Sequence, residues 1–407
     1  MVINMSGKQK PLIRFKGFTE AWEQRKLGEV FEEYSEKNHE ELSALMIVQG
    51  GGTLRRDESE RNLMYDKANL SNYKMVNEGD FIVHLRSFEG GLEMATNTGI
   101  ISPAYHTLHG ENTDSRFYYS YFRSKKFIDT DLKPHVYGIR DGRSIDIDGM
   151  KTINIPYTIF SEQKAIGDYI STIDHLITLH QRKLEKLKNV KKSCLEKMFP
   201  NNGKNIPEIR FSGFTEDWEQ RKLGEVCNSF EYGLNVAAKE FDGINKYIRI
   251  TDIDDDSRVF LDSDLTSPDC DLSSAEKYKL QVGDIVFART GASVGKTFIY
   301  KVSDGLVYYA GFLIRAKINA NFYPDFVFYN TLTKEYEKFI RITSQRSGQP
   351  GVNAQEYSNF EFSLPSYEEQ KRIGNFFCNL DYLITLHQRK LEKLKNIKKS
   401  MLEKMFV

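Results

Sequence analysis

The chain has 407 residues, of which 28% are charged and 13% aromatic, and its formal net charge at pH 7 is zero. This length allows two domains with separate cores, and no apolar run approaches the roughly 20 residues of a membrane-spanning helix. The four cysteines form no CxxC pair and the first ten residues are polar, which argues against a disulfide framework, a cysteine zinc site and a signal peptide, and favours a cytoplasmic location.

Two segments of the chain occur twice. The cap segment Ile13–Val30 (IRFKGFTEAWEQRKLGEV) returns at Ile209–Val226 with 16 of 18 residues identical, and Asp174–Phe199 returns at Asp381–Phe406 with 23 of 26 identical. The stretches between them share no comparable identity. A period of about 200 residues indicates a domain duplication rather than a solenoid of short units. We therefore expect two half-molecules related by a pseudo-twofold axis, in which a shared frame carries two different inserts.

The two inserts, which we call the first body (residues 31–160) and the second body (residues 227–367), mix short β-like and helix-like runs. Gly and Asp residues interrupt these runs. We predict that each body is an α/β (α+β) domain with a twisted, largely antiparallel sheet. The β-like runs are residues 80–85, 284–288 and 297–300, and the helix-like runs are residues 114–128 and 325–342.

The second repeat predicts a long helix in each half, beginning near Glu162 and Glu369, with Ser161 and Ser366 as N-caps. Its apolar residues alternate steps of four and three, which is the seam of a coiled coil. Because each half ends with its helix, we predict an antiparallel pair of helices within the chain. His180 and His387 should face each other near the middle as a packed, neutral pair. The predicted seam includes Ile177, His180, Leu184, Leu187, Ile384, His387, Leu391 and Leu394.

These patterns divide the chain into four expected parts. They are a first domain (residues 1–160), a central helix (161–199), a second domain (200–368) and a C-terminal helix (369–407). Each repeated helical segment carries seven Lys or Arg against three Asp or Glu, so its net charge is +4. Such a basic segment is suited to phosphates or to an acidic partner protein, although a merely solvated lysine face is equally consistent with it.

No sequence motif predicts catalysis. The loop Thr290–Thr297 (TGASVGKT) has three residues between its glycines where a nucleotide-binding P-loop has four, and a strand-like run follows it. Asn154–Tyr157 (NIPY) departs from the Asn-Pro-Pro-Tyr loop of adenine methyltransferases. No spacing fits a metal-dependent nuclease, a zinc hydrolase or a nucleophilic triad. We therefore interpret the chain as a binding protein.

Two polar loops in each body are candidate contacts to nucleic acid. In the second body a predicted strand delivers an arginine into a Gly-rich loop (GDIVFARTGASVGK, residues 283–296), and the first body has a similar strand followed by a different loop. Arginine can bind guanine O6 and N7 as a fork, whereas lysine and a Gly-rich backbone suit phosphate. A second polar loop precedes each long helix, at residues 137–144 in the first body and 341–353 in the second, although any single arginine there is equally consistent with a solvated surface. The candidates are Arg86, Ser87, Arg140, Arg143 and Ser144 in the first body, and Arg289, Thr290, Ser293, Lys296, Arg346, Ser347, Gln349 and Asn353 in the second.

The whole chain resembles the specificity subunit of Type I restriction–modification enzymes. The resemblance rests on the two GFTExWEQRKLGEV segments, on GDIVFARTGASVGK, on EEQKRIGNFFCNLD with its partner SEQKAIGDYISTID, and on the duplicated QRKLEKLK helices. It implies two target recognition domains that each read one half of a bipartite, asymmetric sequence in double-stranded DNA. The helices between them are then expected to set the spacer and to dock two modification (methyltransferase) subunits, and restriction subunits complete the full complex.

The resemblance also implies a non-catalytic subunit. S-adenosylmethionine, ATP and Mg²⁺ are then expected on the partner subunits, and no cofactor or metal on this chain. In the first body SFEGGLE replaces TGASVGK, so its reading residues stay open. From the residues alone, two alternatives remain: a coiled-coil scaffold that joins two protein-binding domains, and a fused nuclease or methyltransferase. The sequence gives neither the bases that are read nor the length of the spacer.

Overall fold

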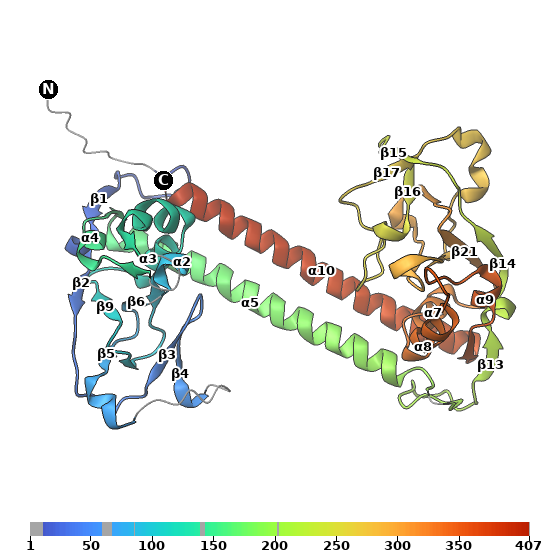
Figure 1. The fold of residues 1–407 in the computed structure, drawn as a ribbon, viewed down its shortest axis with the longest axis horizontal. Helices are drawn as coiled ribbons and strands as arrows, with labels where there is room; N and C mark the ends of the chain where they lie inside the picture. The colour runs from blue at the N-terminus through green and yellow to red at the C-terminus, as the bar shows by residue number, and fades with distance from the viewer. Residues whose placement is uncertain (1–10, 59–66, 85, 139–142, 202, 407) are drawn as a thin grey trace. The chain divides into compact units, whose positions relative to one another are not determined.

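The computed structural model describes residues 11–58, 67–84, 86–138, 143–201 and 203–406 (Figure 1). The chain forms two compact units: unit 1 comprises residues 1–181 and 390–407, and unit 2 comprises residues 182–389. Each unit therefore contains one body, part of the long helix that follows this body, and part of the long helix of the other repeat.

The first body is built on a four-stranded antiparallel sheet with the strand order β2-β9-β6-β7. These strands are β2 (Glu32–Tyr34), β9 (His106–His109), β6 (Phe81–Val83) and β7 (Glu93–Met94). Further antiparallel pairs are β1 (Glu23–Lys26) with β12 (Asn154–Tyr157), β3 (Leu45–Val48) with β4 (Gly52–Arg55), β5 (Lys74–Val76) with β8 (Gly99–Ile101), and β10 (Val136–Tyr137) with β11 (Ser144–Ile145). The helices are α1 (Leu27–Val30), α2 (Ser87–Gly90), α3 (Ser115–Phe122), α4 (Ile147–Lys151) and a π-helix (Phe127–Leu132), with 3₁₀ turns at Arg56–Glu58, Lys67–Asn72 and Lys133–His135.

Aromatic rings fill the core of unit 1. The ring of Phe31 meets those of Phe81 and Tyr118 edge to face, at centroid distances of 5.4 and 4.9 Å. Such pairs contribute about 0.5–1.5 kcal/mol each beyond their buried area. Trp22 from the first cap and Phe406 from the end of the chain pack into the same core, with ring centroids 6.1 Å apart. The first cap, the first body and the last residues of the second repeat therefore share one hydrophobic core.

The second body repeats this plan with a four-stranded antiparallel sheet of order β14-β21-β18-β19. These strands are β14 (Cys227–Tyr232), β21 (Leu313–Ile318), β18 (Ile285–Ala288) and β19 (Thr297–Ile299). Further pairs are β13 (Glu219–Lys222) with β22 (Glu361–Leu364), β15 (Ala238–Glu240) with β17 (Thr266–Pro268), and the parallel pair β16 (Lys246–Ile248) with β20 (Val307–Tyr309). The helices are α6 (Leu223–Val226), α7 (Pro324–Asn330), α8 (Lys334–Thr343) and α9 (Ala354–Ser358), with 3₁₀ turns at Ile250–Asp252, Leu272–Ser274, Glu276–Tyr278, Gly291–Ser293 and Val302–Asp304.

The core of unit 2 has equivalent contributors. Phe199, at the end of the first repeat, packs against Phe326 with a centroid distance of 5.5 Å, and Trp218 of the second cap packs against the same ring at 5.7 Å. Phe199 and Phe406 occupy the same position of the repeat. Each core is therefore closed by the last residues of a repeated helix and by the tryptophan of a cap.

Two glutamines fix the start of the long helices in the same way. The amide nitrogen of Gln163 donates to the carbonyl of Thr158 at 2.7 Å, and its oxygen accepts from the backbone N–H of Asp114 at 3.0 Å. In unit 2, Gln370 donates to Pro365 at 2.9 Å and accepts from Tyr323 at 3.0 Å. Both glutamines are buried, so these bonds satisfy backbone groups that have no access to water. The shared frame is thus preserved in atomic detail around unlike bodies.

The long helices are α5 (Phe160–Lys197) and α10 (Tyr367–Met405), and they pair antiparallel inside each unit (Figure 1). In unit 1 Lys398 Nζ lies 2.6 Å from Asp174 Oδ1, and in unit 2 Lys191 Nζ lies 2.6 Å from Asp381 Oδ1. In both cases the carboxylate lies in the first half of one helix and the lysine in the second half of the other. The antiparallel pair predicted from the sequence is confirmed.

The predicted seam residues lie on the less exposed side of each helix. Ile384 is buried, and Ile177, His180, Leu184, Leu187, His387, Leu391 and Leu394 are half-buried. Between them, Lys183, Lys186 and Lys188 are exposed. The proposed contact of His180 with His387 would join the two units and stays a prediction.

Several local predictions differ from the structure. Both helices begin two residues earlier than expected, at Phe160 and Tyr367. Ser161 therefore lies inside the first turn and is not an N-cap, whereas Ser366 directly precedes its helix. Within the described ranges, no helix combines the length and apolar composition that crossing a bilayer requires.

The helix-like run 325–342 is divided into α7 and α8. Thr333 causes the break, because its hydroxyl donates to the carbonyl of Asn330 and accepts from the N–H of Tyr336, which ends one helix and caps the next. The run 114–128 is also shorter as an α-helix, since α3 ends at Phe122 and a π-helix follows. The three β-like runs are confirmed as β6, β18 and β19.

Candidate nucleic-acid interface

In unit 2 the central strand β18 ends at Ala288 and is followed by Arg289, whose side chain is half-buried. The guanidinium carbon of Arg289 lies 5.2 Å from the ring centroid of Tyr232 and 6.0 Å from that of Phe312. Both rings are exposed, at 45% and 55% of their areas. Stacking on aromatic faces restricts the guanidinium to few orientations. Arg289 is therefore held, half-buried, beside two exposed rings.

The second polar loop of unit 2 runs beside this strand end. Thr290 forms an antiparallel bridge with Gly351, and the N–H of Gly291 donates to the carbonyl of Pro350 at 3.0 Å. The N–H of Val352 donates to the carbonyl of Arg289 at 2.9 Å. The two loops that the sequence singled out separately, about 60 residues apart in the chain, therefore form one surface.

The predicted residues of this second loop have different roles. Ser347 and Gln349 are exposed. Arg346 is also exposed, but its guanidinium donates to the carbonyls of Thr343 and Gln345 at 2.8 Å and pairs with Glu356, so most of its donors are used inside the loop. Asn353 caps α9, because its side chain accepts from the N–H of Glu356 at 2.9 Å.

Lys296 is buried, although the sequence offers it as a candidate contact to nucleic acid. Its side chain is 7% exposed, and its ammonium group donates to the carbonyl of Ile253 at 3.0 Å and lies 2.5 Å from Asp255 Oδ1. These partners hold the charge within the domain, so Lys296 is unavailable to a phosphate in this conformation. Thr290 and Ser293 are half-buried around the same turn. In this loop, Arg289 is thus the best placed of the four predicted residues.

In unit 1 the corresponding strand β6 ends at Val83, and Arg86 precedes the short helix α2 with its side chain exposed. Ser87 is buried instead, and its hydroxyl oxygen accepts from the backbone N–H of His84 at 2.9 Å, which shapes the turn. The guanidinium of Arg143 lies 5.2 Å from the ring centroid of Phe88 on α2. In unit 1 the short helix that follows the central strand therefore meets the end of the second polar loop.

A small cleft of about 60 Å³ lies between these two segments of unit 1. Ser144, exposed on β11, lines it together with Phe88, Arg143 and His84. Burial and the charges of Arg123 and Arg86 lower the pKa of His84 from 6.5 to about 4, so the ring is neutral at physiological pH. The remaining predicted residue, Arg140, lies outside the described residues.

Some residues of these two surfaces were missed by sequence reasoning. Tyr232 and Phe312 are ordinary aromatic residues in the sequence, and only their contact with Arg289 distinguishes them. Phe88 lies within the loop SFEGGLE, and no feature of the sequence distinguishes it from its neighbours. An aromatic residue next to a Gly, as in Tyr232-Gly233 and Gly311-Phe312, is a weak signal that a close turn exposes a ring. Within the described parts of the chain, no group of three or more His, Cys, Asp or Glu side chains is placed to hold a metal ion.

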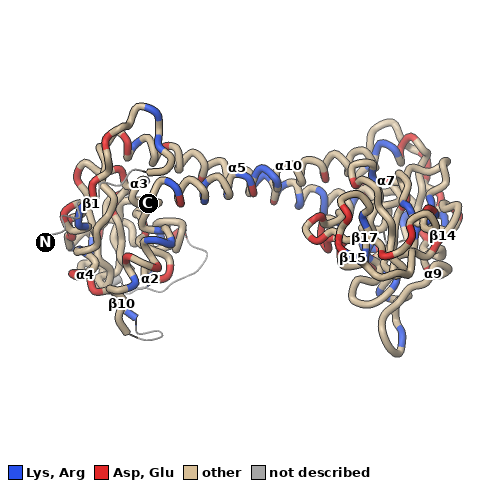
Figure 2. Tube along the Cα trace, turned by 90° about the horizontal axis from the view of Figure 1, so that it is seen from above, with Lys and Arg blue, Asp and Glu red and all other residues tan. Residues whose placement is uncertain are grey.

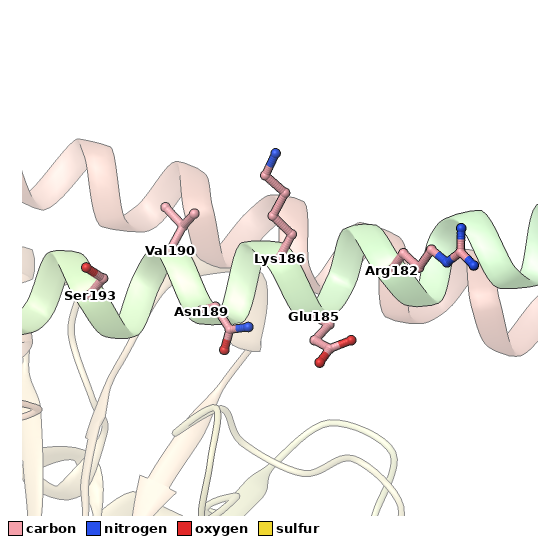
Figure 3. A pocket seen from close by; sticks show the side chains of 6 residues that line it. All are labelled: Arg182, Glu185, Lys186, Asn189, Val190 and Ser193. Carbon is pink, nitrogen blue, oxygen red and sulfur yellow. The ribbon is translucent and has the colours of Figure 1, made fainter. Parts of the chain in front are cut away.

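The long helices present a second type of surface. Figure 2 shows Lys and Arg recurring along α5 and α10, whereas both charge signs are mixed over the bodies. On the part of α5 in unit 2, Lys186 and Val190 project from one side of the helix and Glu185 and Asn189 from another (Figure 3). Leu176 and Leu179 of α5 in unit 1 are 37% and 52% exposed. These faces combine lysines with exposed apolar side chains.

The comparisons with known proteins agree with the duplicated design. The sequence model of the Type I restriction modification DNA specificity domain matches the chain twice, over residues 19–189 and 215–396. The chain belongs to this family. Each match spans one body, its cap strand and much of the following helix, so each specificity domain is one complete half of the duplication.

Relatives within the family span most of the chain. The chain is 25% identical over 348 residues to the Type I restriction enzyme MjaVIII specificity subunit of Methanocaldococcus jannaschii, which covers 81% of this chain and 78% of that protein. It is 22% identical over 268 residues to the EcoKI specificity subunit of Escherichia coli, covering 62% and 57%. The fold is similar to the crystal structure of the Type I restriction–modification S subunit from M. genitalium, with a TM-score of 0.63, 16% identity and coverage of 98% and 99%.

Proposed function

We propose that the chain is the DNA sequence-specificity subunit of a Type I restriction–modification complex, in which each body reads one half of a bipartite, asymmetric target. One observation carries the proposal. In both units the segment that follows the central strand meets the second polar loop of the body, and arginines stacked on aromatic rings lie at this junction. The junction is built twice from different residues on the same frame, which is what two different half-site sequences require.

The helices serve in this proposal as the spacer and as the dock for partners. The exposed Leu176 of α5 has Leu383 as its repeat equivalent on α10, and Leu383 is also exposed. Lys186 and Lys393 are equivalent and exposed in the same way. Because equivalent faces occur twice, they suit two copies of one partner, here two modification subunits.

The chain itself contributes recognition and no chemistry in this scheme. We expect S-adenosylmethionine on the modification subunits, and ATP and Mg²⁺ on the restriction subunits, in the cytoplasm where the complex meets DNA.

The test is to map adenine methylation by long-read sequencing in cells that carry the chain with its modification subunits. The proposal expects one bipartite motif with two unlike halves and a fixed spacer. Methylation independent of sequence would refute it. A scaffold would instead give DNA affinity whose logarithm does not change with the logarithm of salt concentration, and an enzyme would show turnover by the purified chain alone.

The spacer role has its own test. Deleting one heptad from both repeated segments shortens each helix by about 10 Å at 1.5 Å per residue. The expected result is a changed spacer with both half-sites unchanged. New half-site sequences would contradict a spacing function of the helices.

A further inference from the structure

The first body carries a Gly-rich hairpin turn that the sequence motifs did not single out. Strands β3 and β4 pair with Val48 opposite Gly52, so residues 49–51 (Gln-Gly-Gly) form the turn, and Gln49 and Gly50 are exposed. Gly50 and Gly52 adopt φ values of +79° and +75°, which favour glycine. The turn is therefore fixed in conformation by its sequence.

A buried carboxylate anchors this turn to the domain. Glu93, with 0% of its area exposed, accepts from the backbone N–H groups of Gly50 at 2.6 Å and Gly52 at 3.3 Å. It also accepts from the hydroxyl of Tyr119 at 2.9 Å and pairs with Arg123. Charge-assisted bonds to a buried carboxylate are stronger than neutral ones. The exposed turn is thus held rigidly, as a reading element requires.

The side chain of Gln49 reaches the candidate interface. A Cβ atom placed on Gly90 would stand 1.9 Å from Gln49 Nε2, so the amide lies directly against the last residue of α2. The same helix follows the exposed Arg86 and carries Phe88, on which Arg143 stacks. Gln49 therefore joins Arg86 and Arg143 around α2.

The second body has the same arrangement, built from a different part of the chain. A Cβ atom placed on Gly291 would stand 2.8 Å from Gln349 Nε2, and Gly291 begins the short 3₁₀ turn that follows Arg289 and Thr290. In each body, an arginine that follows the central strand precedes a short helix or 3₁₀ turn, and a glycine of this element lies against a glutamine amide. Gln349 precedes the long helix, whereas Gln49 comes from the hairpin, so sequence alignment does not pair them.

We propose that Gln49 is a specificity-determining residue of the first body, which reads a base edge in the major groove; this rests on the proposed function. A glutamine amide offers one donor and one acceptor side by side, and adenine N6 and N7 present the complementary pair. Gly90 leaves room for the amide beside Arg86. The anchored turn fixes where the amide stands relative to α2.

The test uses the assembled complex and methylation mapping. Gln49→Ala should make one position of one half-site degenerate, with discrimination there reduced about 10- to 100-fold. Gly90→Ala should affect the same position, because its methyl group displaces the amide. Gln349→Ala serves as the matched change in the other body and should act on the other half-site. Gln220→Ala, an exposed glutamine of the second cap strand, is the negative control.

Each outcome decides the matter. An unchanged motif for Gln49→Ala, a change in the half-site that responds to Gln349→Ala, or an equal loss of methylation at all sites would overturn the role of Gln49. Unfolding of the purified variants, followed by tryptophan fluorescence, separates Gly90→Ala misfolding from displacement of the amide. If the unaltered complex shows no bipartite motif, the proposed function fails instead, irrespective of Gln49.

Discussion

Arg14 and Glu162 form a two-point ion pair in unit 1, with Arg14 Nε 2.5 Å from Oε1 and Nη2 2.7 Å from Oε2. Trp22 Nε1 donates to the same carboxylate at 3.1 Å. Unit 2 repeats the pair as Arg210 and Glu369, at 2.7 and 2.8 Å. Both glutamates are fully buried, so a buried ion pair joins each cap to the start of a long helix. Removing one partner of such a pair leaves an uncompensated charge and destabilises the fold.

Glu162→Gln should therefore destabilise unit 1 by about 3–5 kcal/mol, since it leaves the Arg14 guanidinium without its charge partner. The chain has two tryptophans, one in each cap, so a Trp218→Phe background makes Trp22 the sole reporter of unit 1 during urea unfolding. Glu23→Gln, which removes an exposed pair with Arg25, is the control and should cost less than about 1 kcal/mol. Equal effects of the two changes would show that the buried pair is not a structural joint.

The antiparallel helix pairing predicts a charge-swap rescue. Asp174 accepts from Lys398 Nζ at 2.6 and 2.7 Å. Asp174→Lys places two lysines together and should lower the free energy of unfolding of unit 1. Adding Lys398→Asp should recover most of this loss, with a coupling energy of about 0.5–3 kcal/mol. The exposed pair of Lys164 and Asp168 on the same helix should show little coupling in the same urea measurements, and additivity at Asp174 and Lys398 would contradict the pairing.

Arg289→Ala should relax one half-site only. The loss of a bidentate base contact costs about 1–3 kcal/mol of discrimination, and the second half-site is read by the other body in the proposed function. Methylation mapping of the assembled complex measures it. Arg221→Ala, which alters an exposed arginine of the second cap, is the matched control. Equal loss at both half-sites would indicate a folding defect rather than lost reading.

Lys296→Met should act on stability and not on DNA. The ammonium group holds the carbonyl of Ile253 inside the domain, and its removal should lower the unfolding free energy of unit 2 by about 1–3 kcal/mol. Because the ammonium group of Lys296 is held inside the domain, the slope of log affinity against log salt concentration should stay unchanged for the assembled complex. A slope reduced by about one would instead assign a phosphate contact to Lys296.

His84 predicts a dependence of stability on pH. Burial, with the charges of Arg123 and Arg86, lowers its pKa to about 4 from 6.5. The folded state therefore holds the neutral ring, its contribution is fully present above pH 6.5, and it is lost as pH falls toward 4. His84→Asn should lose less unfolding free energy between pH 7 and about 4.5 than the unaltered chain.

The half-buried His39 supplies a control of opposite sign. Hydrogen bonds that the ring donates to the carboxylates of Glu41 and Glu36 raise its pKa, so its contribution is present at low pH and fades as pH rises through the raised value. Urea unfolding of His84→Asn and His39→Asn at several pH values measures how the free energy of unfolding of each variant depends on pH. Parallel pH profiles for His84→Asn and the unaltered chain would show that the ring is not kept neutral by folding.

The long helices were predictable because their apolar residues recur with a period of about 3.5 residues. The duplicated frame was predictable because its two copies are nearly identical in sequence. Neither pattern requires knowledge of the fold. The break between α7 and α8 was not predictable, since it depends on two hydrogen bonds of one hydroxyl group, that of Thr333. The candidate surfaces were predicted in part. Arg289 follows a recognisable strand, whereas the turn that carries Gln49 is held by Glu93, a residue distant in sequence. The burial of Lys296 also depends on such a contact, with Ile253.

The N–H of Leu12 donates to the carbonyl of Lys404 at 2.9 Å, and the N–H of Ile209 donates to that of Lys197 at 2.8 Å. The second bond closes a continuous stretch of chain, while the first joins opposite ends of the sequence. A circular permutation would exploit this equivalence. A copy of residues 200–208 would connect residue 406 to residue 11, and the chain would be opened within the original 200–208. The paired strands and both long helices would stay intact. Each cap is therefore bonded to the end of a repeated helix in the same way, whether or not the chain is continuous between them.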